Sequence, residues 1–308
     1  YKRQAVDRPV GMPSAVAFSP DGTTLYVVNA SSNDISVVDL SMGFGIGHIE
    51  VGDNPKGIVV TTNGKTAYVH NVLSGDLSVV DLDNFVENDR IQVTTNPLPP
   101  DVLAGKILFH SSDRIEVAKD QWISCASCHF ESGHDGRTWI FSEGLRNTTS
   151  IKGLSATAPF HWSGDRSDLF DFNSTVVERQ FGTGLSEEEN AQLAAFLGFE
   201  EFSSSPFLKT EATERGRLIF ETIGCTNCHV GKTFTDGLLH EVGTGNRLDE
   251  RFDLEFNTPT LLGLWDSAPY LHHGQADTLY EVFSGKHGQE HALNFKISDS
   301  DLNDVVAY

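Results

Sequence analysis

The sequence is poor in basic residues and contains no long hydrophobic run. Its 308 residues include 22 Lys and Arg against 43 Asp and Glu, which gives a formal net charge of -21. A chain this acidic repels a phosphate backbone, so nucleic acid is not expected as a partner. No apolar stretch reaches the roughly 20 residues that a transmembrane helix requires, and we expect no transmembrane segment.

Cysteine is scarce as well, and its placement is informative. The four cysteines fall in two pentapeptides, which read C-A-S-C-H at residues 125–129 and C-T-N-C-H at residues 225–229. None is left over for a structural disulfide. A four-cysteine zinc site would not require a histidine after each pair, and a thioredoxin-like dithiol would not occur twice.

The C-x-x-C-H spacing suits covalent attachment of haem. Two thiols separated by two residues reach the vinyl groups on one porphyrin edge, and the adjacent histidine is placed to bind the iron. The sequence therefore predicts two covalently attached c-type haems. The predicted cofactor-binding residues are Cys125, Cys128 and His129 for the first haem, and Cys225, Cys228 and His229 for the second.

A chain of this length exceeds what one hydrophobic core usually organises, and its first part is repetitive. In residues 1–97, Pro13 recurs as Pro55 at a period of 42 residues. Tyr26 recurs as Tyr68 at the same spacing. Each unit holds β-rich runs separated by turn formers such as Asp-Gly and Asn-Gly. These units resemble the YVTN family of β-propeller repeats.

Only two blades and a remnant are present, whereas a closed propeller needs about four to eight blades to remove its exposed strand edges. We therefore expect further blades upstream in the native protein or from another copy of the chain, as in a homo-oligomer. The expected fold is multidomain, with a partial β-propeller followed by two mainly α cytochrome c-like domains.

A second, longer repeat covers the rest of the chain. Residues 147–160 align without gaps on residues 257–270, and six of the fourteen positions are identical. Upstream, residues 105–109 pair with residues 216–220, each on an expected helix that leads to a haem motif. The chain is therefore expected to hold two related single-haem domains. The expected domains are residues 1–97, 98–205 and 206–308.

These motifs together resemble the bacterial di-haem cytochrome c peroxidase and MauG family over about residues 98–308. Besides the two C-x-x-C-H motifs, the resemblance rests on Arg146-Asn147, on Trp162-Ser163-Gly164-Asp165-Arg166 and on Ala268-Pro269-Tyr270-Leu271-His272. It implies that the first haem is peroxidatic and that the second holds or relays an electron. The propeller repeats suggest a surface or periplasmic branch of the family.

The resemblance also implies roles for residues around the first haem. The tryptophan between the haems would be Trp162, with a buried core tryptophan as the alternative. The distal acid that delivers a proton as the O–O bond breaks would be Glu178, although Gln180 competes and a solvated surface glutamate is the alternative. His134 or His161 could swing onto the first iron, and an ordinary packed histidine is the alternative for His161.

The sixth ligand of the second iron departs from the family pattern, in which it is a methionine or a tyrosine. The only methionines of this chain are Met12 and Met42, both in the propeller repeats. By position in the family, His287 is favoured, with His291 and Tyr280 as rivals. A second histidine should lower the reduction potential, because methionine ligation raises it.

The family also binds a calcium ion between its haem domains. By position, the ligands here would be Asn147, Ser267 and Pro269. Their oxygen atoms are the hard donors that calcium prefers. The alternative for Asn147 is that it caps a turn.

These observations predict a periplasmic or cell-surface di-haem oxidoreductase, because c-type haem is attached outside the cytoplasm. It would reduce hydrogen peroxide with electrons from a redox partner protein such as a small cytochrome or a cupredoxin. The acidic surface favours a basic donor. The alternatives are a non-catalytic di-haem electron carrier and a MauG-like oxidation of a protein or an organic substrate.

Overall fold

The computed structural model describes residues 8–202, 204–207, 209–245, 254–284, 291 and 297–308. Its contacts divide the chain into two compact units. The first comprises Tyr1–Cys128 and Phe172–Phe196, and the second comprises His129–Asp171 and Leu197–Tyr308. The domain boundaries expected after residues 97 and 205 remain predictions.

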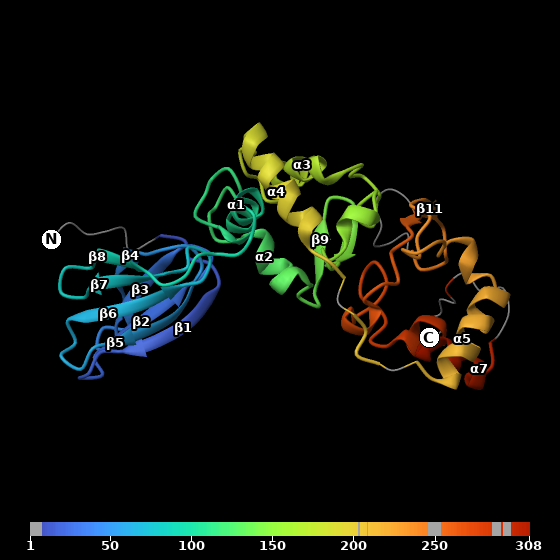
Figure 1. The fold of residues 1–308 in the computed structure, drawn as a ribbon, viewed down its shortest axis with the longest axis horizontal. Coiled ribbons are helices and arrows are strands. Elements are labelled where there is room, and N and C mark those ends of the chain that lie inside the picture. The colour runs from blue at the N-terminus through green and yellow to red at the C-terminus, as the bar shows by residue number, and fades with distance from the viewer. Residues whose placement is uncertain (1–7, 203, 208, 246–253, 285–290, 292–296) are drawn as a thin grey trace. The chain divides into compact units, whose positions relative to one another are not determined.

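The first unit begins with two four-stranded antiparallel sheets, drawn in blue and cyan in Figure 1. The first sheet contains β1 (Pro13–Phe18), β2 (Thr24–Asn29), β3 (Asp34–Asp39) and β4 (Phe44–Glu50) in that order. The second contains β5 (Pro55–Val60), β6 (Thr66–Asn71), β7 (Asp76–Asp81) and β8 (Val86–Gln92) in that order. The register shifts just after Pro13 in one sheet and just after Pro55 in the other. Each sequence repeat therefore forms one sheet.

The two sheets share an apolar core. Val28, Ile35, Val37, Val69 and Val80 belong to it and are 0% exposed. Full burial of each such side chain contributes about 1.5–3 kcal/mol. The arrangement is propeller-like, and within the described part of the chain the sheets do not close into a ring.

A buried polar contact set also repeats between the sheets. The Nδ2 of Asn29 donates to Asp34 Oδ1 at 3.0 Å and to Ser36 Oγ at 2.8 Å. Asn71 makes the same two contacts with the corresponding residues of the second sheet. Because the asparagines and aspartates are buried, the contacts satisfy groups that would otherwise destabilise the fold.

The helices of the first unit follow the sheets. They are α1 (Pro100–His110), α2 (Cys125–Cys128), α3 (Phe172–Arg179) and α4 (Glu187–Phe199), of which α4 extends past the boundary of the unit. On α1, a Cβ at Gly105 would lie 1.9 Å from the carbonyl oxygen of Gln192, so only glycine allows α1 and α4 to pass this closely. Phe109 packs on Phe196 with 5.1 Å between ring centres.

The second unit has less regular structure. Its strands and helices are β9 (Thr138–Phe141), β10 (Gly144–Asn147), α5 (Glu211–Thr222), β11 (Leu239–His240), β12 (Phe256–Asn257), α6 (Leu279–Phe283) and α7 (Asp299–Ala307). Short 3-10 turns lie at Phe130–Ser132, Leu154–Ala156, Leu169–Asp171, Cys225–Asn227 and Leu264–Asp266. Strand β9 pairs with β10, and β11 pairs with β12, both antiparallel.

The crossing of α5 and α7 repeats the crossing of α1 and α4. Gly216 is the repeat counterpart of Gly105, and a Cβ there would lie 1.9 Å from the carbonyl oxygen of Asp304 on α7. Arg215 adds an ion pair to Asp304 at 2.7 Å. The duplication expected from the sequence thus has the same close helix contact in each half. Among the described residues, no helix combines the length and apolar composition needed to cross a bilayer.

Candidate functional site

The first C-x-x-C-H motif starts on a short helical turn. Helix α2 spans Cys125–Cys128, and the motif histidine, His129, follows it with a partly buried side chain. The Nδ1 of His129 lies 2.9 Å from the carbonyl oxygen of Thr149. Because a carbonyl only accepts, Nδ1 carries the hydrogen and the lone pair lies on Nε2.

The second motif repeats this arrangement. It starts on the 3-10 turn Cys225–Asn227, and the Nδ1 of His229 lies 2.9 Å from the carbonyl oxygen of Phe234. Burial lowers the pKa of His129 to about 4 and also lowers the pKa of His229. Both imidazoles therefore stay neutral at pH 7, in the tautomer that offers Nε2 to a metal.

The cysteines fit haem attachment better than zinc binding. Burial raises the pKa of Cys125, and it raises the pKa of Cys225 to about 11. Among the described residues, no group of possible metal ligands joins the two cysteine pairs, so they do not form a four-cysteine zinc site. No disulfide joins the four sulfurs. Together with the two histidine tautomers, this donor set fits one c-type haem at each motif.

A further group of possible metal ligands adjoins the second motif. The ligand atoms of Cys228, Asp236 and His240 lie within 4.8 Å of one another. The closest pair is His240 Nε2 and Asp236 Oδ2, at 2.7 Å. Because the sulfur of Cys228 is needed for haem attachment, we assign this group to the surroundings of the second haem rather than to a separate metal site.

Of the two distal candidates, Gln180 lies at the first motif. Its Nε2 is 3.5 Å from the Sγ of Cys125, and its Oε1 is buried without a hydrogen-bond partner among the described residues. Glu178 lies on α3 with an exposed side chain. An amide cannot deliver a proton, so Gln180 can orient a bound molecule but cannot act as the acid.

Trp162 is held by one asparagine from each repeat. Its Nε1 donates to the carbonyl oxygen of Asn147 at 3.0 Å. Its carbonyl oxygen accepts from the backbone N–H of Asn257 at 2.8 Å. These bonds fix both the ring and the backbone of Trp162 between the two duplicated segments.

The residue-by-residue alignment of the repeats places His272 opposite Trp162, and the two rings meet in a T-shaped contact with 6.4 Å between centres. His272 is 1% exposed and stacks on Phe256 at 3.8 Å. Burial, reinforced by the neighbouring His273 and Arg146, lowers the pKa of His272 to about 2. Our reading of the sequence missed this contact, although the alignment of the repeats contained the signal for it.

The two repeats also exchange a pair of side-chain hydrogen bonds. The Nδ2 of Asn147 donates to the carbonyl oxygen of Pro269 at 2.6 Å, and the Nδ2 of Asn257 donates to that of Pro159 at 2.7 Å. Both asparagines are buried, and the Oδ1 of each lacks a hydrogen-bond partner among the described residues.

Two of the three expected calcium ligands, Asn147 and Pro269, thus lie together, and the unpartnered Oδ1 of Asn147 fits a hard cation. The hydroxyl of the third, Ser267, donates to its own turn at 2.9 Å.

The two histidines considered for the first iron have polar partners. His161 Nδ1 lies 2.8 Å from Asp165 Oδ1, and His134 Nε2 lies 2.8 Å from the carbonyl oxygen of Asp266. Burial tends to raise the pKa of Asp165, but hydrogen bonds from His161 and Ser163 hold it well below the ordinary value. His161 and Asp165 therefore form a charge-assisted pair.

The candidates for the sixth ligand of the second iron differ in placement. His287 lies outside the described residues. The hydroxyl of Tyr280 donates to Asp299 Oδ1 at 3.0 Å. His291 lies beside His229, with 6.4 Å between ring centres and 36° between ring planes. Burial lowers the pKa of His291 to about 4, and its Nδ1 has no partner among the described residues.

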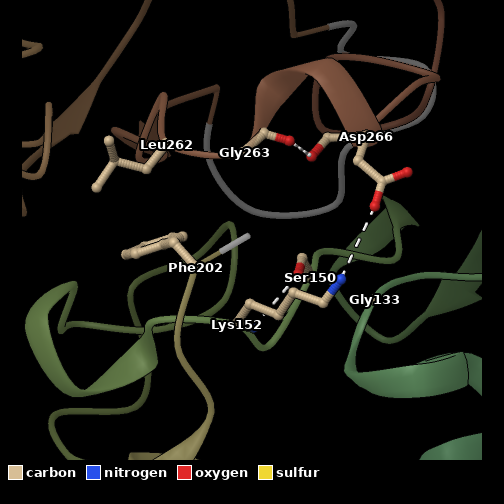
Figure 2. Close-up of a pocket in the computed structure, with 8 residues that line it drawn as sticks. Gly133, Ser150, Lys152, Phe202, Leu262, Gly263 and Asp266 are labelled. Carbon is tan, nitrogen blue, oxygen red and sulfur yellow. Dashed lines mark hydrogen bonds and ion pairs between the residues drawn. The ribbon is translucent and has the colours of Figure 1, made fainter. Parts of the chain in front are cut away.

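A small pocket is lined by residues from both repeats (Figure 2). In Figure 2 the Lys152 ammonium points to the carboxylate of Asp266, and the two groups are 3.8 Å apart. The lining residues are Gly133, Ser150, Lys152, Phe202, Leu262, Gly263, Asp266 and Ser267. None of the haem-attaching residues lines it, so we treat it as part of the junction between the repeats.

Comparison with known proteins agrees with the family resemblance. No family model matches the chain. The hydrazine synthase subunit gamma of Kuenenia stuttgartiensis is 28% identical over 249 residues, covering 60% of this chain and 70% of that protein. The methylamine utilization protein MauG of Methylorubrum extorquens is 28% identical over 280 residues, covering 69% of this chain and 78% of that protein.

One solved structure supports the fold. A chain of Kuenenia stuttgartiensis hydrazine synthase matches with a TM-score of 0.58 at 24% identity, covering 70% of this chain and 88% of that chain. The two relatives support a MauG-like di-haem cytochrome family as the class of this protein. They also support an oxidoreductase role with c-type haem as cofactor.

Proposed function

We propose that this chain is a di-haem c-type oxidoreductase that reduces hydrogen peroxide at the first haem with electrons relayed by the second. The observation that carries the proposal is Trp162, which is hydrogen-bonded to Asn147 and to Asn257 and is thereby held between the two duplicated haem segments. An aromatic ring fixed in this way suits electron relay between two redox centres.

The bound haems would supply the redox-active irons, and the chain supplies ligands and protons. His129 and His229 would each present a neutral imidazole Nε2 to an iron, because a backbone carbonyl holds the Nδ1 hydrogen. Reduction of a peroxide consumes a pair of electrons and a pair of protons. Gln180 has no proton to give. The protons would therefore come from the exposed Glu178 or from the His161–Asp165 pair.

For the sixth ligand of the second iron we propose His291. Two metal–nitrogen bonds of about 2 Å, plus about 1 Å from nitrogen to ring centre on each side, place two opposed imidazole centres about 6 Å apart. The 6.4 Å between His229 and His291 matches that separation. Two histidine ligands favour a low potential and an electron-transfer role for this haem.

Several further assignments belong to the same proposal. The protein would work in the periplasm or at the cell surface, where c-type haem is attached. Its donor would be a small cytochrome or a cupredoxin with a basic face, because opposite charges speed association with an acidic chain. Asn147 and Pro269 would hold a calcium ion between the haem segments, and the two sheets would provide a scaffold for docking.

Two other candidate functions have specific support. Similarity to MauG favours oxidation of a partner protein or an organic substrate. The separation of His229 and His291 favours a six-coordinate iron, and a chain with both irons so coordinated would be a pure electron carrier.

An optical and EPR comparison of the oxidised protein, before and after peroxide, tests these functions. A high-spin ferric signal that peroxide abolishes, with turnover of a reduced cytochrome, is expected for the peroxidase. Turnover of organic or protein substrates without cytochrome oxidation would favour the MauG-like reaction. Complete absence of a high-spin signal would favour the carrier, and a colourless protein after cytochrome maturation would overturn the haem assignment.

A further inference from the structure

The first sheet contacts the segment that leads into the first haem motif through buried serines. Ser31 lies in the turn between β2 and β3, Ser112 follows α1, and Ser124 directly precedes Cys125. Ser31 and Ser112 are 0% exposed and Ser124 is 1% exposed. All belong to the first compact unit. The sheet therefore meets the haem-attaching segment over a surface that excludes water.

A continuous series of hydrogen bonds crosses this surface. The backbone N–H of Ser112 donates to the carbonyl oxygen of Ser31 at 2.7 Å. The Oγ of Ser31 donates to the Oγ of Ser124 at 3.4 Å. The backbone N–H of Ser124 donates to the Oγ of Ser127, inside the motif, at 3.0 Å. The series thus runs from the sheet to the first turn of α2.

The packing around these bonds leaves no room for a side chain at Gly11. A Cβ there would lie 2.6 Å from the Oγ of Ser112, 2.7 Å from the Oγ of Ser31 and 3.1 Å from the carbonyl oxygen of Trp122. Met12 adds a contact of 3.8 Å between its sulfur and the Oγ of Ser124. The strand-preceding loop of the first sheet therefore fits closely against the haem-attaching segment.

The first repeat departs from the second at the residues that make these contacts. At the period of 42 residues, the counterpart of Ser31 is Leu73 and the counterpart of Gly11 is Asp53. The neighbouring Ser32, by contrast, recurs as Ser74, and each bonds an aspartate within its own sheet. The departures at positions 11 and 31 thus coincide with the contact to the haem-attaching segment, not with the needs of the sheet.

We propose that Gly11 and Ser31 position the first haem motif, so that the first sheet is a structural part of the first haem site. Ser31 acts through Ser124, which holds the start of α2 and thereby Cys125. Hydrogen bonds and solvent exclusion around an attached haem tune its potential. The inference rests on the proposed function only in requiring that haem is bound at the first motif.

The test is a spectroelectrochemical titration of the full haem-loaded chain. Ser31→Ala and Ser124→Ala should each shift the midpoint of the first haem in the same direction and leave that of the second in place. The double variant should shift it no further than the larger single variant, because both remove the same bond. A chain with Cys225→Ala and Cys228→Ala retains only the first haem and assigns its midpoint.

Ser78→Ala is the matched control. Ser78 is also 0% exposed and accepts two hydrogen bonds, one from Asn71 on β6 and one from Gly52 in the loop between the two sheets. It should lower the unfolding midpoint without moving either potential, and Gly11→Ala should move the first potential as Ser31→Ala does. Unmoved potentials in haem-loaded Ser31→Ala and Gly11→Ala, or an equal shift in Ser78→Ala, would overturn this inference alone. Absence of bound haem in the unaltered chain would overturn the proposed function as well.

Discussion

The imidazoles of His229 and His291 lie with their ring centres 6.4 Å apart and their planes inclined by 36°. One iron between them would bind both through nitrogen. Both rings are partly buried, and burial lowers the pKa of each, so both are neutral electron-pair donors at pH 7. A neutral pair at this separation suits the bis-histidine ligation proposed for the second haem.

His291→Met should therefore raise the midpoint potential of the second haem, because methionine stabilises the reduced iron more than histidine does. His291→Ala should convert the second haem from low-spin to high-spin in the EPR spectrum. His287→Ala is the control and should leave both the potential and the spin state unchanged. The reverse result, with His287→Ala changing the spin state and His291→Ala silent, would return the assignment to His287.

Trp162→Phe should slow electron transfer between the haems by about tenfold or more, corresponding to at least about 1.4 kcal/mol in the barrier. Phenylalanine keeps an aromatic ring but loses the hydrogen bond to Asn147 and is much harder to oxidise. Flash photolysis or stopped-flow reduction of the loaded protein measures this rate. Trp139→Phe is a matched control, since Trp139 also makes one indole hydrogen bond, at 3.0 Å to Asp135. Equal slowing in both variants would remove Trp162 from the relay.

Removing either side of the reciprocal asparagine contact should destabilise the second unit. Asn147→Ala and Asn257→Ala each remove the side-chain donor to a partly buried proline carbonyl, at a cost of about 1–3 kcal/mol in urea unfolding. If calcium binds at Asn147, elemental analysis should also show its loss in Asn147→Ala. Asn173→Ala, which removes a similar two-bond contact to Leu185, controls for stability and should retain the ion. Calcium content unchanged in Asn147→Ala would exclude this site.

The sequence predicted the fold best where residues close together in the chain determine the local structure. The recurrence of Pro13 as Pro55 predicted two equivalent β units, because the same turn chemistry and strand alternation occur twice. The alignment of Gly105 with Gly216 predicted related helices, and the structure adds the reason for the glycines. In both places a carbonyl oxygen occupies the space that a Cβ would need.

Long-range contacts were beyond the reach of residue patterns. The alignment of the repeats pairs His272 with Trp162, but only the structure shows that the two rings are in contact. The contact between Ser31 and Ser124 joins residues 93 positions apart, and serine at either position carries no signal by itself. The sixth ligand stays a prediction, because His287 lies outside the described residues and counting along a family pattern fixes a position only when the intervening loop keeps its length.

The partly buried His110 should make the stability of the protein depend on pH. Burial lowers its pKa from 6.5 to about 4. Above pH 6.5 the imidazole is neutral in the folded and unfolded chain, and its contribution is fully present. As the pH falls from 6.5 toward 4 the unfolded chain takes up the proton first, so the free energy of unfolding should fall by about 1–3 kcal/mol. In urea unfolding of the loaded protein, His110→Phe should flatten this part of the profile, because the ring stays but cannot titrate. Parallel profiles for the two proteins between pH 6.5 and 4 would show that His110 titrates alike in both states.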